Sequence, residues 1–374
     1  MMGKVLFVSH IANFAKFNYP YMCWFREQGW QVDYISAGEE EVKDCDTSYT
    51  MAARRNPLSP KNFTAYRQLQ QIMEQEKYDI VHCHTPVGGV LARLAARKFR
   101  KSGMKVIYTA HGFHFYKGAP LQNWLIYYTV EKFCARYTDT LVTINEEDYQ
   151  CAVGKKFKAK QIVKIDGVGV DLQRFCYQPQ KKEELRRKYE IDQETYVLIC
   201  VAEVNRNKDQ RFLIENMQQL KERIPQICLY IVGRGEELES CKELVKVSGL
   251  QEEVKFLGYR KDIEDLLTVS DVLVSASQRE GQPINIIEGM ACAIPIVCSD
   301  VRGQRDLVTS GENGIVYKLG DSEAFCEAIY KLYKQPELVQ TFAQNSIQKV
   351  PKYSMKRAIE NMSVIYKQYM RKEK

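Results

Sequence analysis

The feature that most constrains this fold is the alternation of short apolar segments with longer amphipathic ones along all 374 residues. The short segments are rich in Val and Ile and fall into two series: 5–8, 32–36, 80–84, 106–110 and 141–145, then 197–204, 228–232, 254–257, 272–275 and 295–299. Segments with helical spacing lie between them, such as 60–76, 89–101, 210–223 and 284–293. Near-continuous apolar strands that alternate with helices form parallel sheets covered on both faces. Two such series predict an α/β chain with two doubly wound domains.

A polar stretch that ends near Lys181 and Lys182 separates the two series. We therefore expect an N-terminal domain at residues 1–178 and a C-terminal domain that begins at residue 179. In open parallel sheets, ligands bind at the carboxyl ends of the strands. Two facing sheets would place the functional site in a cleft between the domains.

The N-terminal segment and the cysteines both predict a cytoplasmic protein. The first ten residues hold one Lys and a short apolar run, too short for a signal peptide, and no apolar run approaches the ~18–20 residues of a membrane span. The twelve cysteines include no C-x-x-C pair. Scattered cysteines in strand-like runs are typical of small buried residues in a reducing compartment.

The formal net charge of +7 is unevenly distributed. Residues 1–178 contain 24 Lys and Arg against 17 Asp and Glu, residues 179–348 contain 22 against 28, and residues 349–374 contain 8 against 2. Because the second half is acidic, we expect no nucleic-acid partner. A basic first half and tail instead favour contact with an anionic surface.

Two glycine pairs resemble the start of a dinucleotide fingerprint. The full G-x-G-x-x-G pattern lets the backbone approach a pyrophosphate directly after a strand. The segment 233–235 has Leu238 where the third glycine belongs, and the segment 167–169 has Leu172 there. The sequence also lacks the G-x-x-x-x-G-K-[ST] phosphate loop. These departures disfavour hydride transfer and P-loop chemistry.

The segment Asp44-Cys45-Asp46 has the D-x-D form of a short metal-binding signature. It lies in an acidic loop that starts at Glu39 rather than after a strand, so we interpret it as solvated surface. No other cluster of ligand residues stands out, and we expect neither a metal site nor another cofactor.

The most informative segment is 279–292, R-E-G-Q-P-I-N-I-I-E-G-M-A-C, which follows the strand at 272–275 and opens into a helix. Pro283 suits the first turn of that helix. Free N–H groups at a helix N-terminus bind a diphosphate with help from the helix dipole. Here those groups belong to Ile284, Asn285 and Ile286. Two glutamates eight residues apart, such as Glu280 and Glu288, also occur by chance in any long protein. Here the Gly-x-Pro turn and the small residues around them favour a site.

This segment resembles the E-x(7)-E signature of the retaining glycosyltransferases of family four, which have the GT-B fold. The similarity extends over nearly the whole chain and includes 201–208, 256–260, 295–297 and 303–307. In the first half, 84–89 and 110–114 resemble the bacterial capsule and exopolysaccharide branch. The resemblance implies two Rossmann-like domains that face a central cleft. It assigns 1–178 to the acceptor side and 179–353 to the nucleotide-sugar donor, with a C-terminal helix at 354–374 that packs back on the first domain.

The resemblance also assigns roles to residues of the second domain. Glu280 would bind hydroxyls of the donor sugar at the catalytic centre, and Glu288 would bind the nucleotide ribose. Lys208 would neutralise the diphosphate. The family usually has an arginine shortly before this lysine, where the chain has Glu203, and Arg206 is the candidate to replace it. The remaining donor-binding positions at the helix mouth are Gly281, Ile284, Asn285 and Ile286.

All five histidines lie in the first 114 residues. His111 matches a family position that faces the donor sugar, and it is the second catalytic candidate. A general-base role is attractive because histidine titrates near neutrality. His84 and His10 are the acceptor-side candidates, whereas His82 is interpreted as a packed strand residue.

The implied reaction moves a sugar, with retention, from a nucleotide-diphosphate donor such as a UDP-sugar to a glycan or lipid-linked acceptor. In bacterial surface polysaccharide synthesis that acceptor would be a polyprenyl-diphosphate-linked glycan. A sugar-nucleotide epimerase of GT-B-like architecture, a glycoside hydrolase with paired carboxylates and a non-catalytic nucleotide-sugar-binding protein are the alternatives.

The first half also predicts a docking surface for the inner face of the membrane. The segment 93–101 has five cations and no acid, and further cations occur at Arg54, Arg55, Lys61 and Arg67. Aromatic residues at 124–128, 133 and 137 are flanked by Lys117, Lys132 and Arg136. A few cations near an anionic leaflet, at about 1 kcal/mol each, suffice for reversible attachment.

Overall fold

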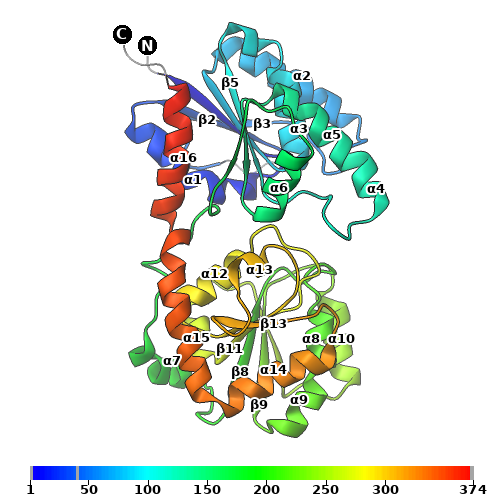
Figure 1. Cartoon of the computed structure of the whole chain (residues 1–374), viewed down its shortest axis with the longest axis vertical. Helices are drawn as coiled ribbons and strands as arrows, with labels where there is room; N and C mark the ends of the chain where they lie inside the picture. Colours follow the sequence, from blue (N-terminus) through cyan, green and yellow to red (C-terminus); the bar gives the residue numbers. More distant parts are fainter. Residues whose placement is uncertain (1–2, 39–41, 371–374) are drawn as a thin grey trace. The chain divides into compact units, whose positions relative to one another are not determined.

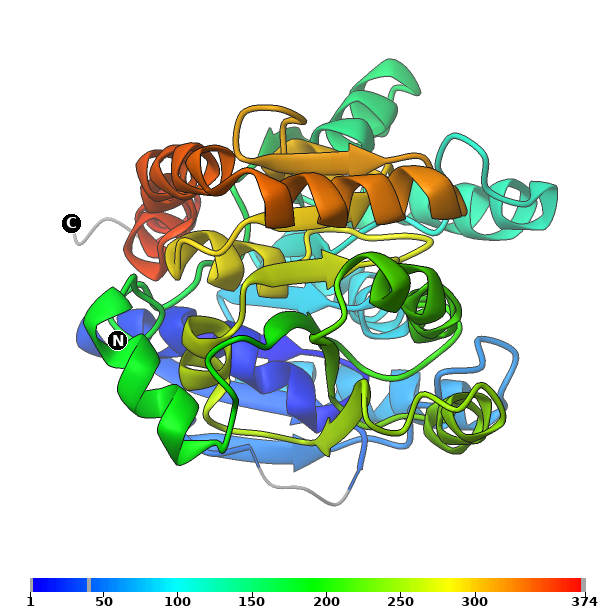
Figure 2. The ribbon, with the colours of Figure 1, turned by 90° about the horizontal axis from the view of Figure 1, so that it is seen from below.

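The computed structural model describes residues 3–38 and 42–370. The chain divides into two compact units, Met1–Gly169 with Met355–Lys374, and Val170–Ser354. In each unit helices cover both faces of a parallel sheet (Figure 1 and Figure 2). The boundary falls before the expected division at 178 and 179, because Val170 donates to the carbonyl of Tyr353 and Phe175 enters the core of the second unit.

The first unit contains a seven-stranded parallel sheet of order β3-β2-β1-β4-β5-β6-β7. Its strands are β1 (Lys4–Val8), β2 (Gln31–Ser36), β3 (Thr47–Thr50), β4 (Ile80–His84), β5 (Lys105–Ala110), β6 (Thr140–Thr143) and β7 (Gln161–Lys164). The five strands of the first predicted series are all present. The two edge strands, β3 and β7, were not predicted, since they are short and their side chains are not buried.

The helices of this unit are α1 (Ala15–Glu27), α2 (Lys61–Glu76), α3 (Pro86–Ala96), α4 (Leu121–Asn123), α5 (Thr129–Cys134), α6 (Glu146–Gly154) and α16 (Met355–Tyr369). Tighter or wider turns occur at η1 (Ala12–Phe14), η2 (Phe99–Ser102), η3 (Trp124–Tyr128) and η4 (Ala135–Tyr137). Helix α3 contacts both α2 and α5, so these three helices share one face of the sheet.

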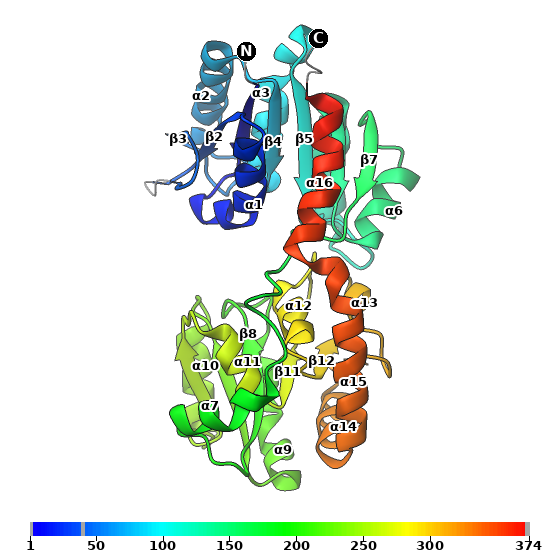
Figure 3. The same cartoon turned by 90° about the vertical axis from the view of Figure 1, so that its left-hand side faces the viewer.

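Helix α16 lies on the other face of the first unit, against α1 (Figure 3). Its Met362, Ile365 and Tyr366 enter the core there. The chain returns to this unit beside Gly169, whose φ is +86°, and a Cβ at that position would stand 2.5 Å from the Cα of Met355. The 167–169 glycine pair therefore serves a close backbone approach. Part of the range expected for the C-terminal helix, 371–374, lies outside the described residues.

The second unit contains a six-stranded parallel sheet of order β10-β9-β8-β11-β12-β13. Its strands are β8 (Tyr196–Val201), β9 (Ile227–Val232), β10 (Val254–Gly258), β11 (Val272–Ser275), β12 (Ile296–Ser299) and β13 (Gly314–Tyr317). Its α-helices are α7 (Lys182–Lys188), α8 (Gln210–Glu215), α9 (Met217–Arg223), α10 (Leu238–Val247), α11 (Ile263–Val269), α12 (Ile284–Ala291), α13 (Gln304–Leu307), α14 (Ser322–Lys334) and α15 (Pro336–Lys349). The 3₁₀ turns are η5 (Pro179–Lys181) and η6 (Val350–Tyr353).

The glycine pair at 233–235 also has a packing role. A Cβ on Gly233 would stand 1.9 Å from the carbonyl oxygen of Ala202, and one on Gly235 would stand 2.1 Å from that of Val204. Both glycines thus let the loop after β9 pass close to the loop after β8. Within residues 3–38 and 42–370, no helix is both long and apolar enough to cross a membrane.

The expected basic segment at 93–101 is wrong as a continuous surface patch. Arg93 is 0% exposed and forms a 2.8 Å ion pair with Glu131, while its Nε donates to the carbonyl of Gly89. Its guanidinium carbon also lies 3.9 Å from the centre of the Tyr108 ring. Arg100 donates two hydrogen bonds of 3.0 Å to the buried carboxylate of Asp139. These two cations serve the fold, because a buried charge needs a partner.

Candidate active site

The sheet order of the second unit places its switch point between β8 and β11. The chain moves outward from β8 to β10 and then returns to β11, so loops leave the carboxyl ends of β8 and β11 toward opposite faces. Ligands of open α/β sheets bind at such a point. Lys208 lies in the first loop and Glu280 in the second, and they form an ion pair whose side chains are 22% and 10% exposed.

Hydrogen bonds hold the two loops together. The N–H of Gln278 donates to the carbonyl of Asn207 at 2.7 Å, and the Asn207 side chain donates to the carbonyl of Arg279 at 3.0 Å. From the other side, Nε of the buried Arg302 donates to the carbonyl of Glu280 at 3.1 Å. The backbone of Glu280 is therefore positioned from both neighbouring loops.

A buried polar network lies at the ends of β11 and β12. Gln304 donates to the hydroxyl of Ser275 at 2.6 Å, and the hydroxyl of Ser299 donates to the carbonyl of Ser277 at 2.6 Å. Sequence reasoning missed these residues. Their signal in the sequence is that a serine ends each of these two apolar strands.

Helix α12 begins beside this pair of loops, with Pro283 at its N-cap. The N–H of Ile286 donates to the carbonyl of Pro283 at 3.2 Å, so the expectation that it is free is wrong. The N–H groups of Ile284 and Asn285 belong to the first turn of α12, where the helix itself offers no earlier carbonyl to accept them. Gly281 lies in the loop before the helix, and a Cβ on Gly303 would stand 2.6 Å from its carbonyl oxygen.

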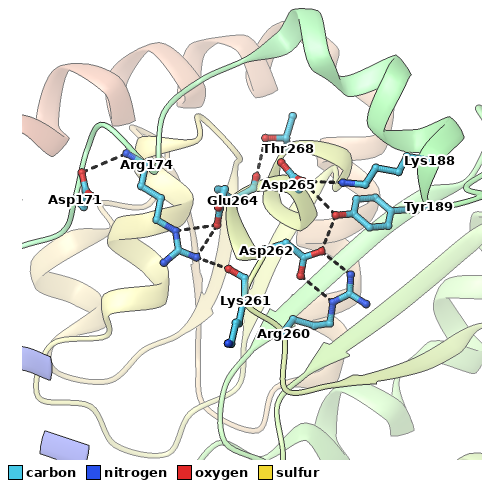
Figure 4. A network of polar contacts seen from close by, with 10 residues as sticks. All are labelled: Asp171, Arg174, Lys188, Tyr189, Arg260, Lys261, Asp262, Glu264, Asp265 and Thr268. Carbon is cyan, nitrogen blue, oxygen red and sulfur yellow. Dashed lines mark hydrogen bonds and ion pairs between the residues drawn. The ribbon is translucent and has the colours of Figure 1, made fainter. Parts of the chain in front are cut away.

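Glu288 lies inside α12 and is partly exposed. Its charge acts on Arg174, a residue that the sequence did not single out. The hydrogen bond to Glu264 raises the pKa of Arg174 most, and Glu288 and Asp171 raise it further. Arg174 donates to Glu264 at 2.7 Å and to the carbonyl of Lys261 at 2.5 Å (Figure 4).

Around Arg174, the loop after β10 and the start of α11 carry further ion pairs. Asp262 accepts from Tyr189 at 2.7 Å and from Arg260, whose hydrogen bonds lower the pKa of that carboxyl (Figure 4). Lys188 pairs with Asp265 at 3.3 Å. This network anchors Arg174, whose pKa the charge of Glu288 also raises.

Arg206 does not join the Lys208–Glu280 pair in the described structure. Its side chain is 88% exposed and pairs with Glu237 at 3.0 Å. Besides Lys208, the cation Arg302 contacts the Glu280 loop, and it lies more than 90 residues after Lys208 in the chain, a separation that no local spacing indicates.

In the first unit the switch point lies between β1 and β4. His10 follows β1, His84 ends β4, and His111 follows the adjacent strand β5. The N–H of His10 donates to the hydroxyl of Thr85 at 3.1 Å. Burial, and then the charge of Arg55, lowers the pKa of His10.

His82, His84 and His111 form one cluster. Nδ1 of His84 lies 3.1 Å from Nε2 of His111, and the rings of His82 and His84 are 4.1 Å apart. His82 is hydrogen-bonded to Thr109 and to Tyr366 of α16, both at 2.8 Å. Burial lowers the pKa of His111 to about 4 and that of His82 to about 3, and it lowers the pKa of His84 well below the usual range. The low pKa of His111 makes it a weak base at pH 7, which disfavours proton abstraction by this residue.

Replacing Lys208 with Ala should weaken binding of a nucleoside diphosphate by roughly ten- to a hundredfold, because a charge-assisted contact contributes about 1.5–3 kcal/mol. Arg206→Ala, the matched control, should change the dissociation constant for UDP less than about twofold, since an exposed ion pair is weak. Titration calorimetry with UDP compares them. A large loss of UDP affinity in Arg206→Ala would instead identify Arg206 as the cation that replaces the family's arginine.

A doubly wound sheet that presents a cation–carboxylate pair and an open helix N-terminus at its switch point defines an α/β protein suited to phosphorylated ligands. Comparison with known proteins narrows this class. Residues 181–349 match the family described as glycosyl transferases group 1, and residues 4–145 match the family described as glycosyl transferase 4-like.

Two relatives and one solved structure illustrate the similarity. EpsD of Bacillus subtilis strain 168, which is named as a glycosyltransferase, is 43% identical over 372 residues, which cover 99% of this chain and 98% of that protein. An Escherichia coli UDP-Gal:alpha-D-GlcNAc-diphosphoundecaprenol alpha-1,3-galactosyltransferase is 27% identical, over 82% of this chain and 78% of its own length. The crystal structure of Anabaena HepE in complex with UDP and glucose superposes with a TM-score of 0.81 at 18% identity, over 98% of this chain and 100% of HepE.

The chain belongs to the family-four glycosyltransferases and has the GT-B fold. The predicted family, fold class and enzyme class are confirmed.

Proposed function

We propose that this glycosyltransferase moves a sugar from a UDP-sugar, with retention of the anomeric configuration, to a polyprenyl-diphosphate-linked glycan in bacterial surface polysaccharide synthesis. The observation that carries the proposal is the Lys208–Glu280 pair at the sheet switch point, beside the open N-terminus of α12. The name of the Escherichia coli relative, with its UDP-sugar donor and undecaprenol-linked acceptor, supports the choice of substrates.

In this proposal the donor diphosphate lies at the mouth of α12. The N–H groups of Ile284 and Asn285 and the ammonium of Lys208 stabilise the negative charge that builds up on the leaving UDP. When Lys208 turns to the diphosphate, Glu280 becomes available for hydroxyls of the donor sugar. Glu288 binds the ribose, and no side chain acts as a covalent nucleophile.

The test incubates the purified protein with a panel of UDP-sugars and synthetic polyprenyl-diphosphate-linked saccharides. An α-linked product from an α-linked donor, assigned by proton NMR couplings, is the expected result. An inverted product would contradict retention. Conversion of the donor to an epimer without acceptor would instead establish the alternative epimerase activity.

We further propose that transfer requires no metal ion, because Lys208 and the α12 N–H groups already supply positive charge to the diphosphate. Within the described residues, no group of three or more His, Cys, Asp and Glu side chains is arranged to hold a metal ion. The initial rate in EDTA should equal the rate without chelator. A loss in EDTA that Mg²⁺ or Mn²⁺ restores would contradict the proposal.

We also propose that the first unit docks on the anionic inner leaflet through an exposed apolar stripe. The helical segment formed by α4, η3 and α5 leaves Leu121 77%, Leu125 68% and Ile126 55% exposed. Its other exposed apolar residues are Val130 and Phe133. A helix with such a stripe and basic flanks lies in the membrane interface.

Cations surround this stripe. Lys117, Arg136, Arg97 and Lys101 are exposed, and Lys132 lies over the ring of Tyr128 at 5.2 Å. A second exposed apolar pair, Leu58 and Phe63, lies at the start of α2 on the same face of the sheet, with Arg54, Arg55 and Arg67 nearby in the chain. The docking surface therefore depends on these residues rather than on Arg93 and Arg100.

In co-sedimentation, the protein should bind vesicles that contain anionic lipid at low salt and be released at high salt, because the Debye length shortens from about 30 Å at 0.01 M to about 3 Å at 1 M. Leu125→Ser should reduce binding severalfold. Val247→Ser, at an exposed apolar position of the second unit, is the matched control and should bind as the unaltered protein does. Equal binding to neutral and anionic vesicles, or none at low salt, would overturn the docking proposal.

A further inference from the structure

The hydrogen bond between His84 and His111 decides which nitrogen of His111 carries its proton. It joins Nδ1 of His84 to Nε2 of His111 at 3.1 Å. Each neutral imidazole has one N–H donor and one acceptor lone pair. Either His84 donates from Nδ1, which leaves His111 protonated on its outer Nδ1, or His111 donates from Nε2, which leaves that outer nitrogen as an acceptor.

The environment of His84 distinguishes these two arrangements. Its Nε2 is buried and has no hydrogen-bond partner among the described residues. If His111 donated, this Nε2 would have to carry a hydrogen and would become a buried donor without an acceptor. If His84 donates from Nδ1, Nε2 is only an unpaired acceptor. Orphaned buried N–H groups are rarer in proteins than under-satisfied acceptors, so the second arrangement is favoured.

Aromatic rings hold the His84 imidazole in this orientation. The His82 ring lies 4.1 Å away, and the Phe7 ring lies parallel to His84 at 6.3 Å. Phe14 contacts both members of the pair, at 5.6 Å from His84 and 4.7 Å from His111. His82 is itself fixed by its hydrogen bonds to Thr109 and Tyr366. A ring flip of His84 would have to disturb this packed group.

We propose that His84 is a positioning residue that holds His111 in the Nδ1–H tautomer, so that His111 presents a hydrogen-bond donor, not a base, to a substrate oxygen. The hydrogen bond to His84 engages only Nε2 of His111 and leaves its Nδ1 for another partner. The substrate oxygen in this proposal rests on the proposed function. The tautomer of His111 is a property of the ligand-free protein.

The test is ¹⁵N NMR of the full chain labelled in histidine, with signals assigned by single substitutions. His111 should show a protonated Nδ1 and an unprotonated Nε2 at pH 7. His84→Asn should preserve this state, because the amide nitrogen takes the place of Nδ1 and still donates. His84→Leu removes the donor and should shift the tautomer toward Nε2–H. His114→Asn is the control, since the His114 ring packs against Tyr127 and lies outside the pair.

Kinetics add a second readout. The kcat of His84→Leu should fall roughly tenfold below that of His84→Asn, about the effect of one hydrogen bond. The kcat/KM of the unaltered enzyme should show no ionisation of His111 between pH 6 and 8. A protonated Nε2 on His111 in the unaltered protein, or an unchanged tautomer in His84→Leu, would overturn the inference. The NMR outcome does not depend on turnover, so a failure of the proposed function would be recognised separately as absent transfer.

Discussion

Replacing Glu288 with Ala should strongly reduce sugar transfer and leave the chain folded. A carboxylate that accepts one or two ribose hydroxyls contributes about 1.5–3 kcal/mol for each, so kcat/KM should fall by roughly ten- to ten-thousandfold. The fold should persist because Glu288 is partly exposed, whereas Ile286, Ile287 and Met290 supply the buried face of α12. Initial rates with a radiolabelled UDP-sugar, together with circular dichroism, measure both effects.

The matched control is Glu243→Ala, which removes an exposed carboxylate from α10 of the same unit. Its kcat/KM should stay within about twofold of the unaltered enzyme, since surface substitutions change stability by only about 0.5 kcal/mol. Full activity in a folded Glu288→Ala protein would remove Glu288 from the donor site.

Arg93→Leu should destabilise the first unit by about 3–5 kcal/mol, because it leaves the carboxylate of Glu131 buried without its cation. Glu131 also accepts a 3.0 Å hydrogen bond from Tyr108, but this single remaining donor cannot compensate a buried negative charge. The free energy of unfolding in urea, followed by tryptophan fluorescence, measures the loss.

Two further variants test the cause of that loss. Arg93→Leu combined with Glu131→Leu should recover much of the stability, since the unpaired charge is gone. Lys98→Ala removes an exposed ion pair with Glu74 and should cost less than about 1 kcal/mol. If Arg93→Leu and Lys98→Ala had equal effects, Arg93 would be an ordinary surface cation after all.

The architecture was largely predictable because it depends on local patterns. All ten predicted strands are present, since an apolar run of a buried parallel strand is visible without knowledge of its neighbours. The edge strands β3, β7 and β13 were missed, because a strand on the rim of a sheet needs no such run. The helix predicted at 210–223 is two helices that meet at Asn216.

The candidate donor site was predictable where its residues share one segment. Glu280, Gly281, Ile284, Asn285 and Glu288 all lie in α12 or in the loop just before it, and Lys208 lies in the loop that contacts Glu280. Arg302, Arg174 and Gln304 were not predictable, because they reach this region from other segments of the chain. Arg206 looked suitable from its spacing, yet its side chain turns to Glu237.

The sequence by itself determined the two doubly wound units, the helix mouth with its carboxylates and the clustering of histidines in the first half, because each is encoded by residues a few positions apart. Only the tertiary structure decided which charges are buried and which nitrogens meet. From the sequence Arg93 is indistinguishable from a surface cation, whereas in the structure it lies 2.8 Å from Glu131. His82 is hydrogen-bonded to Tyr366, which lies 284 positions later in the chain. Burial and pairing depend on contacts between distant segments, and those contacts exist only once the chain has folded.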